Sequence, residues 1–246
     1  MKIITVLILI LTTMQTHDAD IRFGRDTIST SQGDLVITFI GHGSLMFEFN
    51  NHVIQIDPVA QEADYALLPK ADIILITHQH GDHFDPEALQ KTLKKDTRIY
   101  FTEKCSLESG AIGNTVVMKN GDRQEYTGIT IEAVPAYNIL HMRSPGNPFH
   151  PKGEGNGYIV TLGGKRVYIA GDTENTPEMK ALKNIDIAFL PMNLPYTMTP
   201  EMVADAVRAF RPAVLYPYHY GNTNTDKLLN ILGKTLETEV RIRELK

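Results

Sequence analysis

His78, His80, Asp82 and His83 form a dense group of metal-capable side chains directly after the apolar run 73–76. The chain has nine histidines, so a third of them fall in this group. In an extended segment alternate side chains share a face, so the first three can point the same way, and Gly81 allows a turn that aims His83 elsewhere. Imidazole and carboxylate groups bind zinc and similar cations. We favour a metal site over surface or core histidines because of this density.

The segment 77–85, T-H-Q-H-G-D-H-F-D, resembles the H-x-H-x-D-H signature of the metallo-β-lactamase superfamily. Segment 168–173 is similar to the superfamily's strand ending in G-D-T, and 215–220 to its late strand ending in a histidine. Segments 135–138 and 150–153 most resemble its ascorbate-phosphate-lactonase-like branch. The resemblance implies an α/β fold, a four-layer αββα sandwich of two β-sheets with flanking helices.

The resemblance also implies roles for individual residues. The implied metal ligands are His78, His80, Asp82, His83, Asp172 and His219. The first two belong to one metal position, and Asp172 bridges it to a second position formed by the other three. One or two divalent ions are expected, zinc before manganese or iron, because imidazole suits all three and carboxylates bridge paired cations. Asp82 is the implied catalytic residue, which orients the water and handles a proton. The plainer alternatives are a turn aspartate at 172 and a hydrogen-bonded strand-end histidine at 219.

One position departs from the superfamily pattern. A further histidine is usual on the loop after the strand expected at 129–134, and Asn138 stands there instead. Asparagine is a weak, neutral ligand. His141 and His150 lie further along the same loop and can replace it. If neither does, the first metal has three protein ligands, or the enzyme works with one metal.

The loop 136–157 is long and rich in proline and glycine, which is typical of a functional or mobile segment. His150 and Lys152 within it are candidates to bind an anionic substrate or to neutralise its transition state. A solvated loop is the alternative, because exposed charges are common. His42, between two glycines, is expected beside the site as a supporting residue.

These residues predict a metal-dependent hydrolase whose activated water attacks an ester, lactone or phosphodiester-type substrate. A non-catalytic metal-binding or ligand-sensing protein is the alternative that Asn138 keeps open. A nuclease is less expected, because the net charge is −5 and the charges are interspersed without a basic stripe. A small-molecule substrate, and no nucleic acid, is therefore the expected partner; nothing in the sequence predicts an oligomeric state. The lone Cys105 excludes an intramolecular disulfide and is expected to be a small buried residue.

The N-terminal segment differs from the rest. A short charged start and the apolar run 3–11 predict a signal peptide over residues 1–20, too short to span a bilayer. No cysteine lies directly after that run, so a stable lipid anchor is not expected. Export to the periplasm or the outside is expected if the signal is real, and a cytoplasmic location otherwise; a buried N-terminal strand is the alternative. Residues 21–246 are expected to form a single hydrolase domain.

The element pattern repeats within the chain. Shifting the sequence by 114 residues places Gly41 on Gly155 and Pro86 on Pro200, so both halves share one order of strands and helices. Coincidence between generic patterns is the alternative. A duplication predicts two sheets face to face, with the site between them at the strand ends. The expected elements are a strand at 36–40, a hairpin at 45–49 and 53–56, and helices starting at 86, at 200 and near 226.

Overall fold

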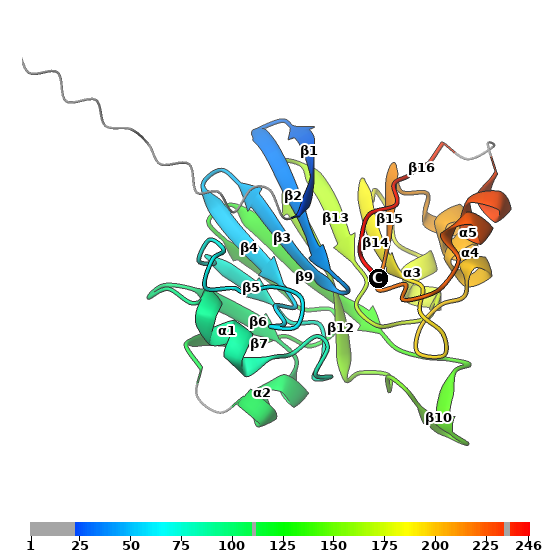
Figure 1. Ribbon diagram of the computed structural model, residues 1–246, viewed down its shortest axis with the longest axis horizontal. Helices are drawn as coiled ribbons and strands as arrows, with labels where there is room; N and C mark the ends of the chain where they lie inside the picture. The colour runs from blue at the N-terminus through cyan, green and yellow to red at the C-terminus, as the bar shows by residue number, and fades with distance from the viewer. Residues whose placement is uncertain (1–22, 110–111, 234–236) are drawn as a thin grey trace, which may run out of the picture.

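The computed structural model describes residues 23–109, 112–233 and 237–246 (Figure 1). The signal peptide predicted over residues 1–20 lies outside the described residues. Among the described residues, no helix combines the length and the apolar character needed to cross a bilayer.

Two seven-stranded sheets face each other, with helices on their outer sides (Figure 1). The first sheet contains, in spatial order, β1 (Gly24–Thr30), β2 (Gly33–Gly41), β3 (Ser44–Phe49), β4 (His52–Ile56), β5 (Ile73–Leu75), β6 (Arg98–Phe101) and β7 (Asn114–Val117). The second contains β16 (Glu239–Val240), β15 (Val214–Tyr218), β14 (Ile187–Pro191), β13 (Lys165–Ile169), β12 (Gly155–Leu162), β9 (Ile129–Ala136) and β8 (Arg123–Tyr126). A small hairpin, β10 (Met142–Ser144) and β11 (Asn147–Pro148), stands apart from both.

Helices cover the outer face of each sheet, which gives the expected four layers. On the first sheet lie α1 (Pro86–Thr92) and α2 (Glu103–Ser109); on the second lie α3 (Pro177–Lys180), α4 (Pro200–Phe210) and α5 (Thr225–Leu232). The predicted helix starts are confirmed, since Asp85 caps α1 and Thr199 caps α4, each followed by proline. The predicted hairpin is confirmed as well, and both Asn50 and Asn51 at its turn have positive φ.

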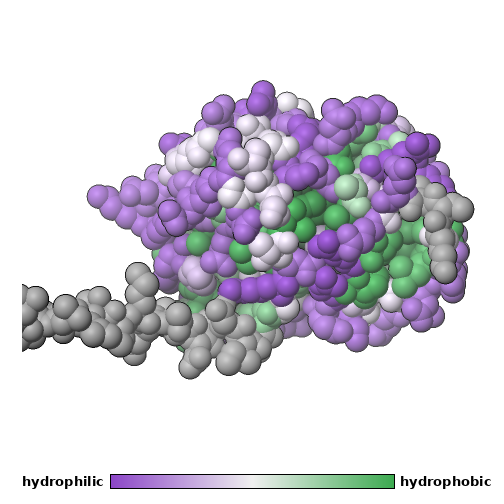
Figure 2. Space-filling model, turned by 90° about the horizontal axis from the view of Figure 1, so that it is seen from above, coloured by the Kyte–Doolittle hydropathy of each residue, from purple (hydrophilic) through white to green (hydrophobic). Residues whose placement is uncertain are grey.

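Strand β5 shows why its sequence is an unbroken apolar run. Ile73 and Leu75 belong to the core between the two sheets, whereas Ile74 and Ile76 pack in the cluster beneath α1 and α2. Both faces of the strand are buried, so no polar alternation is needed. On the molecular surface seen from above in Figure 2, hydrophobic residues gather near the middle of the view, and hydrophilic residues cover most of the surface around them. Cys105 is buried in the same outer cluster, as expected.

The two sheets share one pairing pattern, in line with the repeat seen in the sequence. Antiparallel pairs join β2, β3 and β4 in one sheet and β9, β12 and β13 in the other. Parallel pairing then continues from each strand to the next, through β4, β5, β6 and β7 in the first sheet and through β13, β14, β15 and β16 in the second. Parallel strands place their carboxyl ends at one edge, and loops that leave such an edge are where α/β sheets bind ligands. The metal-capable residues follow β5, β13 and β15 at this edge.

Candidate metal centre

Imidazoles from separate loops converge on one buried carboxylate at the edge between the sheets. His78, His80 and His83 come from the loop after β5, and His219 follows β15 directly. The carboxylate belongs to Asp172, which follows β13. The structure thus brings together every residue that the resemblance implies as a ligand, together with two histidines from other loops.

His78, His80 and His150 form the first group. Their ligand atoms lie within 4.8 Å of one another. The Nδ1 atom of His80 is 3.2 Å from Nε2 of His78 and 3.2 Å from Nε2 of His150. Of the three residues that the sequence left open for this position, His150 is the one that occupies it. His141 instead pairs with Glu174, at 2.8 Å.

Asn138 holds His150 in place. The Oδ1 atom of Asn138 accepts the backbone N–H of His150 at 2.8 Å and lies 2.7 Å from Nδ1 of its ring. The amide nitrogen of Asn138 donates to Glu174 and to the carbonyl of Tyr196, which fixes the oxygen toward the ring. Because an amide oxygen accepts, Nδ1 of His150 carries a proton, and the neutral form of this ring would present the lone pair of Nε2 to a cation.

Replacing Asn138 with alanine is expected to weaken metal binding at the first group by about 10- to 100-fold, because supporting hydrogen bonds orient ligand histidines. Competition with a metal-sensitive dye measures this change. The control is Asn175→Ala, which removes an asparagine whose amide donates to the exposed side chain of Asp205. Equal metal affinity in the two variants would contradict the support role.

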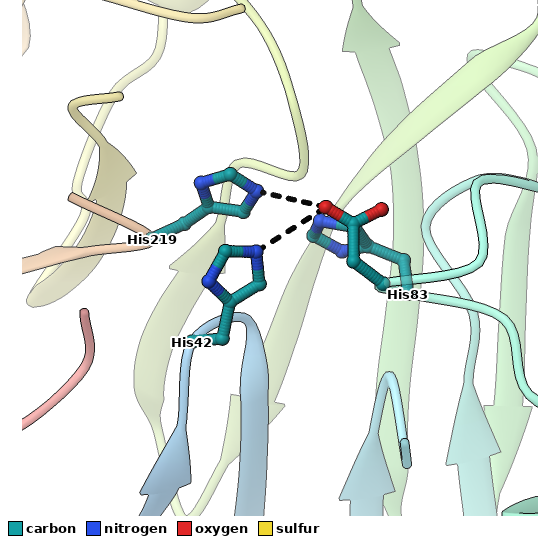
Figure 3. Close-up of side chains that lie close together, drawn as sticks. His42, His83 and His219 are labelled. Carbon is teal, nitrogen blue, oxygen red and sulfur yellow. Dashed lines mark hydrogen bonds and ion pairs between the residues drawn. The ribbon is translucent and has the colours of Figure 1, made fainter. Parts of the chain in front are cut away.

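His42, Asp82, His83 and His219 form the second group (Figure 3). Nε2 of His42 lies 3.3 Å and Nε2 of His219 lies 3.6 Å from Oδ2 of Asp82. Figure 3 shows these two rings reaching the same carboxylate oxygen, one from the turn between β2 and β3 and the other from the end of β15. The ring centroids are 3.7 Å apart. The sequence placed His42 beside the site, and the structure places it within the group.

Asp172 links the two groups. Its Oδ2 atom is 3.3 Å from Nε2 of His150, 3.5 Å from that of His219 and 3.9 Å from that of His78. Its Oδ1 atom is 3.4 Å from Nε2 of His83. One carboxylate therefore touches imidazoles of both groups, which is the arrangement that a ligand shared by two cations requires.

Asp57 supports His83 and was not singled out by sequence reasoning. Its buried carboxylate lies 2.8 Å from Nδ1 of His83 and accepts the backbone N–H and the hydroxyl of Thr77. The available signal was a charged residue directly after the strand expected at 53–56. Close packing holds the other side of the ring, because a Cβ at Gly43 would lie 2.7 Å from Cε1 of His83.

The charges of the centre fit a divalent cation. Burial raises the pKa of Asp172, but the imidazoles of His219 and His83 lower it well below its usual range. Burial lowers the pKa of His83, but the carboxylates of Asp172 and Asp57 raise it to about 9. Burial and the neighbouring His83 lower the pKa of His78, so it is neutral at pH 7, the form that binds metals. The carboxylates of the centre are thus ionised and favour positive charge beside them, which a proton on His83 supplies in the metal-free protein and a divalent cation would supply in its place.

Buried atoms without hydrogen-bond partners give the same indication. Among the described residues, these atoms include Nε2 of His83, both ring nitrogens of His219 and Oδ1 of Asp172. Buried polar groups without partners are rare and costly, and a missing ion is one recognised explanation. The donor set therefore fits one or two divalent metal ions.

Lys152 lies outside both groups. Its ammonium is 2.6 Å from Oε1 of Glu178 and also donates to the hydroxyl of Tyr137. The side chain is 61% exposed and does not line the cavity above the centre. This pairing gives no support to the substrate-binding role expected for Lys152. His150, for which the same role is expected, lies in the first group, where Asn138 directs its ring toward Asp172, and it also lines the cavity; its role in substrate binding stays a prediction.

Comparisons with known proteins agree with this architecture. Residues 36–219 match the family model for the beta-lactamase superfamily domain. A UPF0173 metal-dependent hydrolase from Thermococcus onnurineus is 32% identical over 194 residues, which cover 75% of this chain and 84% of the relative.

Solved structures are similar as well. A Parabacteroides distasonis crystal structure, described as a metal-dependent hydrolase, is 53% identical with a TM-score of 0.85, covering 91% of this chain and all of the other. Igni18, a metallo hydrolase from Ignicoccus hospitalis, shares the fold at 24% identity with a TM-score of 0.68, covering 86% of this chain and 95% of the other. The narrower resemblance to ascorbate-phosphate lactonases stays a prediction.

Proposed function

This chain belongs to the beta-lactamase superfamily and is a metal-dependent hydrolase of that fold, and we propose that both imidazole groups serve one hydrolytic centre. The observation that carries the proposal is the position of Asp172 between the two groups. His78, His80 and His150 would hold one divalent ion, and the second group would hold another, with Asp172 shared. Zinc is the metal that we propose, because imidazole-rich sets with few carboxylates suit it.

Cations bound by these residues would lower the pKa of a coordinated water to about 7 and polarise the oxygen of the bond to be cleaved. The protein's own side chains orient the ligand histidines and accept or donate protons. Asp57 and Asn138 orient His83 and His150 through their Nδ1 atoms. Asp82 is 53% exposed and lines the cavity above the centre, so it can reach both solvent and substrate.

Asp82 is the residue that we propose to orient the attacking water and to accept its proton. Burial raises the pKa of Asp82, but the neighbouring imidazoles of His219 and His42 lower it below its ordinary value. The side chain is therefore a carboxylate at neutral pH, which can accept hydrogen bonds from water. Substrates of the ester, lactone or phosphodiester class fit this chemistry, since each needs an activated water and a polarised oxygen.

The experiment is to measure bound metal and turnover on one substrate of each class, before and after chelation and with metal restored. His80→Ala is expected to lose bound metal and about 100-fold or more in turnover, because a metal that stabilises transition-state charge contributes several kcal/mol. His52→Ala is the control, since His52 lies on β4 and belongs to neither group. Turnover that persists after chelation and in His80→Ala would refute the metal mechanism. Bound metal without turnover on any of the three substrate classes would refute the proposed hydrolytic centre.

A further inference from the structure

The hairpin β10–β11 stands over the metal centre on a firmly held base. The carboxylate of Glu174, almost fully buried, accepts the backbone N–H groups of Ile139, Leu140 and His141 at 2.7–2.9 Å. It also accepts the amide of Asn138, which in turn holds His150. One carboxylate therefore fixes both the entry to the hairpin and a residue of the centre. Figure 1 shows the hairpin extending from the body of the molecule.

A cavity of about 250 Å³ lies between this hairpin and the centre. Five of the residues that line it belong to the metal centre, namely His80, Asp82, His150, Asp172 and His219. The rest of the lining consists of Arg143, Phe149, Asn193 and Tyr196. A volume slightly below the usual range of drug-sized sites favours a small substrate.

Arg143 brings an available positive charge to this cavity. Its guanidinium lies over the ring of Phe149, 5.2 Å from the centroid. In the part of the chain that the structure describes, no carboxylate lies within ion-pair distance of it. Lys152, the cation expected from the sequence, is by contrast already paired with Glu178. A planar guanidinium binds a carboxylate or a phosphate with two parallel hydrogen bonds.

Aromatic side chains form the wall next to this charge. The rings of Phe149 and Tyr196 meet edge to face, with centroids 5.1 Å apart. Tyr196 is 45% exposed, and the neighbouring Leu194 is similarly exposed. Apolar groups left in contact with solvent beside a polar centre are typical of a ligand site.

We propose that Arg143 binds an anionic group, a carboxylate or a phosphate, on a small substrate of this hydrolase. The apolar part of the substrate packs on Phe149 and Tyr196, and its hydrolysable bond faces Asp82. The chemical step rests on the proposed function, whereas the anion site does not. Arg143 therefore selects among substrates, and the imidazole groups act on whichever one is bound.

Calorimetric titration of the metal-loaded protein tests the anion site without turnover. The probes are benzoate, phenyl phosphate and the neutral benzamide. Arg143→Met is expected to weaken binding of at least one anion about tenfold, and that of benzamide less than twofold, since hydrogen bonds to charged groups exceed neutral ones. Arg143→Lys should restore part of the loss. The control is Arg123→Met, an exposed arginine on β8 outside the cavity.

The anion that loses more affinity identifies the group that Arg143 binds. Circular dichroism and metal analysis of each variant separate a local effect from loss of folding or of metal. The anion site is overturned if neither anion binds the wild type, if Arg143→Met binds both anions as the wild type does, or if benzamide loses affinity equally.

A matched pair of esters then links the site to turnover. With 4-acetoxybenzoate, Arg143→Met should lower kcat/KM about tenfold, whereas with neutral phenyl acetate it should change less than twofold. Arg143-dependent anion binding without turnover on any substrate class would overturn the proposed function and leave the anion site standing. If Arg143→Met loses the same activity on both esters, the anion site is overturned and the proposed function stands.

Discussion

Asp172→Ala is expected to release metal from both groups and to reduce turnover by about 1,000-fold or more. Asp172 is the carboxylate that contacts His83, His150 and His219, so its removal takes a ligand from each group at once. It also removes the negative charge that balances the cations in a buried place. A bound metal contributes several kcal/mol to transition-state stabilisation, and each 1.36 kcal/mol is tenfold in rate. Mass spectrometry of bound metal and steady-state kinetics measure the two effects.

Two further variants make the Asp172 result interpretable. Asp172→Asn keeps the size of the side chain but not its charge, so it should lose metal with little change in the circular dichroism spectrum. Asp205→Ala removes an exposed aspartate that contacts Asn175 and Lys180 and belongs to neither group, and it should keep full metal and turnover. Full metal occupancy in Asp172→Ala would show that this carboxylate is not shared between the groups.

Asp82→Asn is expected to lower kcat by about 100- to 10,000-fold while the first group keeps its metal. Positioned general bases contribute about that factor. Asp82 is not part of the His78, His80 and His150 group, and the amide has nearly the same shape as the carboxylate. The second group retains three imidazoles, so saturating metal should refill it. The loss in kcat should therefore persist at saturating metal, whereas KM should change little.

Metal dependence distinguishes proton handling by Asp82 from simple ligation. If excess metal restores the kcat of Asp82→Asn, Asp82 serves as a ligand and another group accepts the proton. The variant His42→Ala is a useful comparison, since His42, on the turn between β2 and β3, contacts the same oxygen of Asp82 that His219 approaches. It should lose less turnover than Asp82→Asn, because the carboxylate that receives the proton is still present.

Much of the fold was predictable because its signals are local. The helix starts at Asp85 and Thr199 depend on a capping side chain followed by proline, and both are confirmed. The two-sheet sandwich follows from apolar strands in a repeated order and from the superfamily motif. The group from His78 to His83 is likewise local, because one short loop after a buried strand carries all four side chains.

Other parts of the site were decided only by tertiary packing. Sequence reasoning left open whether Asn138, His141 or His150 completes the first group, and the outcome depends on Glu174, whose hydrogen bonds fix the course of the loop. Neither Asp57 nor Arg143 belongs to a sequence motif that marks it as part of the site. Their roles arise because two sheets pack face to face and bring remote loops to one edge.

By itself, the sequence determined the metal chemistry, the superfamily and the order of elements, because residue types and short spacings carry that information. The tertiary structure alone decided which histidine completes the first group, how His42 enters the second, and which cation faces the cavity. These depend on contacts between segments far apart in the chain, such as that between His42 and Asp82, and no local pattern specifies their distance.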